Sequence, residues 1–229
     1  MKLKYKKIVL LITLGTMFIG FVTLSLSKPV KNKSKADSVE TSAGQISVDS
    51  TEFTKQTYEG EAGEIILEKD AYDEVNQLVK DYLNARVRCD MDALSSLVSD
   101  VSYLSEKTLQ EKSEYIEGYQ NIECYTVKGL EEDSYIVYVY SEVKILDIDT
   151  PAPGLTSIYI RKTDDDKLCV YFGVLDEETQ NYMKEAAECE GVQELIRSVD
   201  NRFTEALQKD EKLNEFDKKL ENSAKNSNS

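Results

Sequence analysis

The chain has 229 residues, no histidine and no tryptophan, and its 28 basic and 43 acidic residues give a net charge of −15. Because histidine is absent, the sequence excludes Ser-His-Asp and Cys-His nucleophile systems and histidine-ligated zinc or iron sites. The excess of acid argues against nucleic-acid binding, which needs clustered Lys and Arg. Residues 1–35 hold eight Lys and no acid, so the rest of the chain carries a net charge of −23.

An uncharged apolar run of 19 residues occupies positions 8–26. A helix of that length rises about 28 Å, close to the hydrocarbon thickness of a bilayer. We therefore expect residues 1–7 to be a cytoplasmic basic tip and residues 8–26 a transmembrane signal anchor in the cell membrane, with the body of the protein extracellular. Two alternatives stay open: a cleaved signal peptide, and the opposite orientation, because four Lys precede the run and four follow it.

Composition divides the rest of the chain into three parts. Residues 27–69 are rich in Ser, Thr, Lys, Glu and Gly and have few large apolar side chains, which predicts a flexible stalk. Only the apolar residues 65–67 of this segment suggest a short strand or a docking contact. A folded domain is expected over residues 70–220, and an Asn/Ser/Lys-rich disordered tail over residues 221–229.

The folded domain begins with a helical pattern. Apolar residues recur at spacings of three and four from Ala71, which predicts a helix that ends near Arg88. Asp90 is the expected N-cap of a second, short helix, and Ser105 that of a third helix over residues 106–115.

The middle of the domain changes to strand-forming residues. Four segments rich in Val, Ile and Tyr are separated by turn residues, which predicts an antiparallel meander; they are residues 122–127, 135–146, 155–161 and 167–174. Two helical segments follow, residues 177–189 and 192–207, with Gly191 as the expected break. The predicted fold class is α+β, with three N-terminal helices packed on a curved four-stranded antiparallel sheet and two C-terminal helices after it.

One segment resembles a known superfamily. The stretch VNQLVKDYLNARVRCDMDALSSLVS has a long helix and a D-x-D-A-L-x-x-L turn into a second helix, and a meander follows it. This layout resembles the nuclear transport factor 2-like (cystatin-like, cone-shaped) superfamily over residues 71–175. The chain departs from it because no short hairpin separates the early helices and two helices follow the last strand.

The resemblance leaves the function open. The superfamily includes isomerases, dehydratases and many non-catalytic binding or assembly domains, so the fold does not choose among them. In a membrane-anchored form the layout is similar to extracytoplasmic domains of conjugative secretion scaffolds and of some penicillin-binding proteins.

Alternation along residues 135–146 separates an aliphatic sheet face, expected to pack on the helices, from a tyrosine-rich face. The tyrosine-rich face holds the candidate ligand or interface residues Tyr138, Tyr140, Tyr159 and Tyr171. Such a patch favours a homodimer or a protein partner. Alternatively, these side chains only stabilise the sheet, or the C-terminal helix covers them. Tyr135 is expected on the aliphatic face, where it is either a hydrogen-bond donor in a pocket or a tyrosine of the core.

No metal, redox or catalytic motif emerges from the sequence. The four Cys form no C-x-x-C pair, and both free thiols and two disulfides are open; they are Cys89, Cys124, Cys169 and Cys189. The acidic turns at 147–149 and 164–166 do not continue as a calcium-binding loop. We therefore assign no metal ligand, no cofactor and no catalytic residue.

The leading functional hypothesis is a membrane-anchored extracytoplasmic binding or interaction domain without catalysis. One alternative is an isomerase- or dehydratase-type enzyme that uses carboxylate and tyrosine acid-base chemistry. Another is a scaffold subunit of an envelope or conjugative secretion assembly. An ionisable group enclosed in a cone pocket favours the enzyme, whereas a filled cone together with a bare tyrosine-rich sheet face favours binding or assembly.

Overall fold

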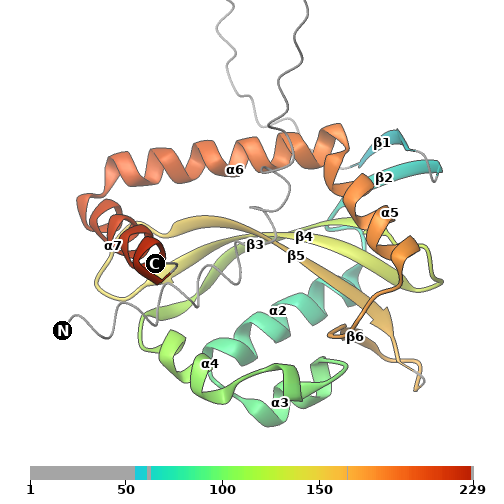
Figure 1. The fold of residues 1–229 in the computed structure, drawn as a ribbon, viewed down its shortest axis with the longest axis horizontal. Helices are drawn as coiled ribbons and strands as arrows, with labels where there is room; N and C mark the ends of the chain where they lie inside the picture. The colour runs from blue at the N-terminus through green and yellow to red at the C-terminus, as the bar shows by residue number, and fades with distance from the viewer. Residues whose placement is uncertain (1–54, 61–62, 164, 228–229) are drawn as a thin grey trace, which may run out of the picture.

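The computed structural model describes residues 55–60, 63–163 and 165–227. It folds them into one six-stranded sheet with helices on both faces (Figure 1). The strands lie side by side in chain order, and each pairs antiparallel with the next. Short connections join all neighbouring strands except the second and third, which are separated by residues 70–115, and only antiparallel neighbours can be joined by tight turns.

The elements come in alternating blocks of strands and helices. The strands are β1 Lys55–Gly60, β2 Gly63–Lys69, β3 Ile116–Lys128, β4 Ser134–Ile145, β5 Ala152–Lys162 and β6 Leu168–Val170. The α-helices are α2 Asp73–Val87, α3 Met91–Leu97, α4 Glu106–Ser113, α5 Glu177–Glu188, α6 Glu190–Lys209 and α7 Glu211–Ser227, and a 3-10 turn, η2, covers Val101–Tyr103.

Two hydrophobic cores lie on opposite faces of the sheet (Figure 1). The first core lies between the sheet and α2, α3 and α4, and Leu94, Val137 and Ile160 are fully buried in it. The second core lies under α5 and α6 and includes Val192. Residues 136–140 of β4 are all buried, which shows that both faces of the central sheet are covered.

The predicted starts of two helices are confirmed by their capping contacts. The Asp90 carboxylate accepts a hydrogen bond from the Ala93 N–H at 3.0 Å, so α3 begins directly after it. The Ser105 hydroxyl accepts one from the Thr108 N–H at 3.3 Å at the start of α4. These side chains satisfy N–H groups that the first helical turn leaves unpaired.

The α+β class is confirmed, but the sheet has six strands rather than four. The additional pair, β1 and β2, lies within residues 27–69, where the sequence predicted a flexible stalk. This hairpin is ordered by tertiary contacts, since Ile65 and Leu67 are 1% and 0% exposed in the second core and β2 pairs with β3. The ordered part of the domain therefore begins before residue 70, and its helices do not come first in the chain.

The C-terminal part was also predicted with too few helices. Three helices, α5, α6 and α7, follow the sheet, and the break between the first two lies at Cys189, whose ψ of 149° is extended, rather than at Gly191. Gly191 lies inside α6, where a Cβ atom would overlap the hydroxyl of Tyr58 from β1. Helix α7 continues through Ser227, into the tail that was expected to be disordered.

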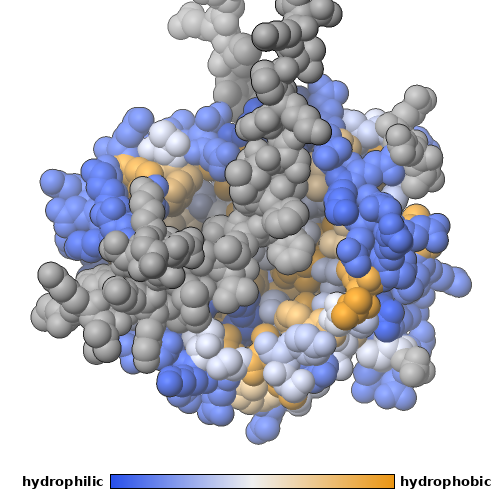
Figure 2. All heavy atoms as spheres, viewed as in Figure 1, coloured by the Kyte–Doolittle hydropathy of each residue, from blue (hydrophilic) through white to orange (hydrophobic). Residues whose placement is uncertain are grey.

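Polar side chains dominate the rim of the face that Figure 2 shows, and apolar ones lie nearer its centre. Figure 2 shows hydrophilic side chains over most of the visible rim of the molecule, as the acidic composition of the body leads one to expect. Within the part of the chain that the structure describes, no helix is long and apolar enough to cross a membrane. The predicted membrane anchor at residues 8–26 lies outside the described residues.

Candidate functional site

The tyrosine-rich face that the sequence offered as a binding surface lies under helices of the same chain. Tyr138, Tyr140 and Tyr159 are 5%, 3% and 6% exposed, and they pack in the second core with α5 and α6. Tyr171 is half-buried at the margin of that core. A partner would reach this face only if α5 and α6 moved away, so an interface through these residues stays a prediction that requires such a movement.

Contacts of these tyrosines link the sheet to α6 and to one another. The Tyr140 hydroxyl donates a hydrogen bond to Glu142 at 2.9 Å, and the Arg202 guanidinium of α6 lies 5.0 Å from the Tyr140 ring centroid. The rings of Tyr159 and Tyr171 meet edge to face with centroids 6.2 Å apart. Aromatic and cation–π contacts of this kind contribute about 0.5–1.5 kcal/mol each. In this arrangement the tyrosine side chains pack in or against the second core.

Tyr135 lies on the opposite face of the sheet, against the first core. It is half-buried, and its ring centroid lies 5.2 Å from that of Tyr72, at the start of α2. Burial, with a smaller contribution from the negative charge of Asp133, raises the pKa of Tyr135. A raised pKa makes the hydroxyl a poorer proton donor, so this environment is that of a tyrosine at the margin of a core.

The four cysteines are free thiols in the structure. Cys124 is fully buried in the first core, and burial raises its pKa to about 12. A buried thiol with a raised pKa is a poor nucleophile. Among the residues that the structure describes, no three Cys, Asp or Glu side chains are placed to hold a metal ion.

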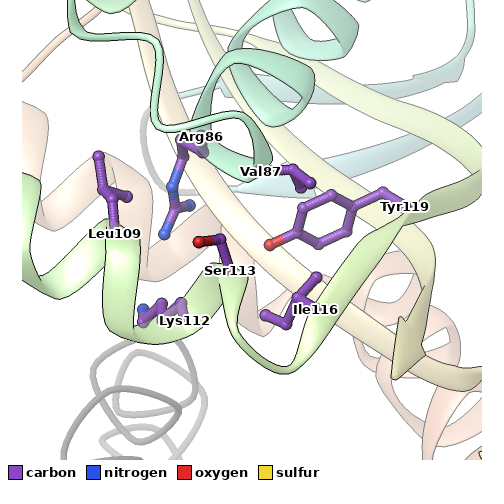
Figure 3. A pocket seen from close by; sticks show the side chains of 7 residues that line it. All are labelled: Arg86, Val87, Leu109, Lys112, Ser113, Ile116 and Tyr119. Carbon is purple, nitrogen blue, oxygen red and sulfur yellow. The ribbon is translucent and has the colours of Figure 1, made fainter. Parts of the chain in front are cut away.

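A small cleft with two cationic side chains opens where α2 ends, between α4 and the start of β3 (Figure 3). Its lining consists of Arg86, Val87, Leu109, Lys112, Ser113, Ile116 and Tyr119. The cavity measures about 10 Å³, which is close to the space that one water molecule needs. None of these seven residues was among the candidates that the sequence provided.

Arg86 reaches from the last turn of α2 toward α4 (Figure 3). Its guanidinium carbon lies 5.3 Å from the ring centroid of Tyr82, which is one turn earlier on the same helix and 5% exposed. The Nε atom of Arg86 is buried, and no described residue accepts a hydrogen bond from it. An unsatisfied buried donor costs about 1–3 kcal/mol, so an acceptor placed beside the Nε–H group of Arg86 would stabilise the protein.

Lys112 of α4 lines the same cleft and is partly buried. Burial, and secondarily the positive charge of Arg86, lowers the pKa of Lys112 from 10.5 to about 8. Both causes disfavour the charged ammonium group, and a carboxylate neighbour would have acted in the opposite sense. Lys112 therefore lies close to the positive charge of Arg86, and no negative charge contributes to the shift of its pKa.

Ion pairs at two other cations give a comparison for Arg86 and Lys112. Lys69 lies 2.8 Å from a carboxylate oxygen of Glu123, and Lys162 lies 2.9 Å from one of Asp133. In the described part of the chain, neither Arg86 nor Lys112 has a carboxylate within 4.0 Å.

The rest of the lining combines one polar group with apolar walls. The Tyr119 hydroxyl, from β3, points toward Ser113 and the space in front of Arg86 (Figure 3). The Ser113 hydroxyl itself donates to the Gln110 carbonyl at 2.9 Å, so Tyr119 is the more available donor. Side chains of Val87, Leu109 and Ile116 form the walls. Chemically, the cleft presents hydrogen-bond donors and positive charge inside an apolar rim.

No family model, curated protein or solved structure matches this chain. The sequence contained little that pointed to the cleft, because Arg86 and Lys112 each lie in the last turn of a helix. Basic residues are common there, since they complement the negative end of the helix dipole.

The pKa of Lys112 predicts a pH dependence of stability. Between about pH 8 and pH 10.5, Lys112 is protonated in the unfolded chain and neutral in the folded one, so unfolding takes up a proton and the free energy of unfolding rises with pH. We expect the difference in free energy of unfolding between wild type and Lys112→Met to shift in favour of wild type across this range. Urea titrations at several pH values measure it. The exposed Lys107→Met serves as control, and a flat difference would contradict the prediction.

Proposed function

We propose that the protein is a membrane-anchored extracytoplasmic binding domain without catalysis, and that it holds an anionic group of its ligand in the Arg86–Lys112 cleft. The observation that carries the proposal is the meeting of these two cations in one cleft with no carboxylate beside them among the described residues. Two like charges withdrawn from water are electrostatically unfavourable, and a bound anion relieves both the repulsion and the unmet donor of Arg86.

The small volume of the cleft favours binding over catalysis. Small-molecule sites usually enclose about 300–1,000 Å³, whereas this cleft measures about 10 Å³, so it holds one group of a larger ligand and does not enclose a whole substrate. The lining also contains no carboxylate. It therefore does not supply the carboxylate–tyrosine pair on which the isomerase or dehydratase alternative depends, and we place that alternative second.

Two further parts of the proposal rest on sequence pattern and layout. The apolar run at residues 8–26 supports the membrane anchor, and the short basic N-terminus before it, which resembles a bacterial export signal, supports the exterior placement of the body. The packing of α2, α3 and α4 on one face of an antiparallel meander supports a nuclear transport factor 2-like fold. Helices α5 and α6 on the other face are an addition to the layout that we expected from that superfamily.

Thermal unfolding of the full chain in detergent micelles tests the anion site. We expect sodium acetate or inorganic phosphate to raise the melting temperature of wild type more than that of Arg86→Gln/Lys112→Met, because a ligand at ten times its Kd adds about 1.4 kcal/mol to the folded state. Arg88→Gln/Lys107→Met is the matched control, since it removes one exposed cation directly after α2 and one from α4. Equal responses in all three proteins would refute the site, and a C-terminal reporter active only in the cytoplasm would refute the exterior placement.

A further inference from the structure

We infer that the group bound in the Arg86–Lys112 cleft is a carboxylate, held by the guanidinium of Arg86, the ammonium of Lys112 and the hydroxyl of Tyr119. The inference rests on the proposed function and goes one step further, because it selects one chemical class of anion. Three observations carry it: the size of the cleft, the number of its donors and the apolar character of its walls.

The size of the cleft favours a small planar group. About 10 Å³ of free space admits about one ligand oxygen without rearrangement of the walls, so the rest of the group lies at the mouth of the cleft. A carboxylate presents two oxygens in one plane, which match the planar fork of a guanidinium in a bidentate contact. A phosphate has its oxygens in a tetrahedral arrangement, so at most two of them lie in the plane of the guanidinium fork.

The donors and walls favour the same group. Arg86, Lys112 and Tyr119 approach the cleft from α2, α4 and β3, while Val87 and Leu109 offer no hydrogen bond. Each charged oxygen against an apolar wall loses its hydration without compensation. A carboxylate uses the available donors fully and places the carbon atoms behind it against the apolar rim, whereas a phosphate leaves oxygens unsatisfied.

The neighbouring aromatic ring keeps the guanidinium in position. Tyr82 is 5% exposed and holds the Arg86 guanidinium carbon 5.3 Å from its ring centroid. A charged side chain held against a ring loses less conformational freedom when a ligand binds, which favours affinity. Because the Nε atom has no acceptor among the described residues, an incoming carboxylate satisfies a donor that is already desolvated.

The side-chain Nε–H signal of Arg86 in nuclear magnetic resonance spectra of the full chain in detergent micelles provides a direct test. The signal is assigned by its absence from the Arg86→Lys variant. The probes are sodium acetate, the free-acid dipeptide acetyl-Ala-Ala, the same dipeptide as its C-terminal amide, and inorganic phosphate. We expect saturable shifts with acetate and with the free acid, no shift with the amide, and an affinity for phosphate at least about tenfold weaker.

Variants separate binding from general charge effects. Lys112→Met is expected to weaken the affinity for acetate by about tenfold, while Lys107→Met on the exposed side of α4 leaves it within about twofold. Circular dichroism establishes that each variant is folded. If the free-acid dipeptide binds more tightly than acetate, the natural ligand is a peptide with a free carboxylate. If the dipeptide and acetate bind with equal affinity, the natural ligand is a small carboxylic acid.

Two results would overturn the inference, and they differ in what else they overturn. In the first, phosphate binds as tightly as acetate and this binding is lost in Lys112→Met. That result would refute the carboxylate but agree with the proposed anion site. An Arg86 signal that no anion shifts up to concentrations of tens of millimolar would refute both the carboxylate and the proposed site.

Discussion

Replacement of Tyr138 by alanine is expected to lower the free energy of unfolding by about 3–5 kcal/mol, because the ring is 5% exposed in the second core. Tyr138→Phe is expected to leave the free energy of unfolding unchanged or to raise it by up to about 1 kcal/mol. The Tyr138 hydroxyl is buried, and no described residue forms a hydrogen bond with it, so removal of this hydroxyl takes away an unsatisfied group. Urea unfolding of the full chain, followed by circular dichroism, measures both changes.

The control for this pair is Tyr103→Ala, since the Tyr103 side chain is 61% exposed and its loss should cost less than about 1 kcal/mol. A Tyr138→Phe variant as unstable as Tyr138→Ala would contradict the prediction, because it would mean that the hydroxyl has a strong partner. A Tyr138→Ala variant as stable as wild type would show instead that α5 and α6 do not cover the sheet. In that case the tyrosine-rich face would again be a candidate partner surface.

Replacement of Leu213 by alanine is expected to destabilise the docking of α7 by about 2–5 kcal/mol. Leu213 is 1% exposed and packs with Ile145, Ile148 and Ala206 in a third, smaller core. Because α7 is the last described helix, the loss should appear first as local opening of this helix rather than as unfolding of the whole domain. Hydrogen exchange of the amides at residues 211–220 is expected to accelerate by more than about tenfold.

Leu146→Ala is the matched control for Leu213→Ala, since Leu146 follows Ile145 in sequence and is 48% exposed. It should leave exchange in α7 unchanged. If exchange in α7 is as slow in Leu213→Ala as in wild type, the helix is held by contacts other than this core. Cooperative destabilisation of every strand to the same extent would show that α7 unfolds together with the sheet.

Local patterns were sufficient for much of the fold. The three-to-four spacing of apolar residues predicted α2, because one face of a helix repeats at that interval. Asp90 and Ser105 predicted the starts of α3 and α4, because a cap depends only on a side chain and the next few N–H groups. The meander of β3 to β6 followed from Val- and Tyr-rich segments with turn residues between them.

Pairings between distant segments were beyond the reach of these patterns. The hairpin of β1 and β2 lies in a polar segment, and its order depends on Ile65 and Leu67 reaching the second core and on pairing with β3, more than 50 residues later. Gly191 looked like a helix break, but it lies inside α6, where a Cβ atom would overlap the Tyr58 hydroxyl. Neither contact leaves a signal in the nearby sequence.

For the candidate sites, too, some properties followed from the sequence and others only from the tertiary structure. The sequence by itself determined that histidine chemistry is excluded, that an acidic body follows a basic, apolar N-terminal segment, and that one sheet face is rich in tyrosine, because these properties depend on composition and alternation. Only the tertiary structure decided that α5 and α6 cover that face and that Arg86 and Lys112 share a cleft. Tyrosine suits a buried layer as well as a surface, and two cations from different helices meet only when both helices pack on the sheet.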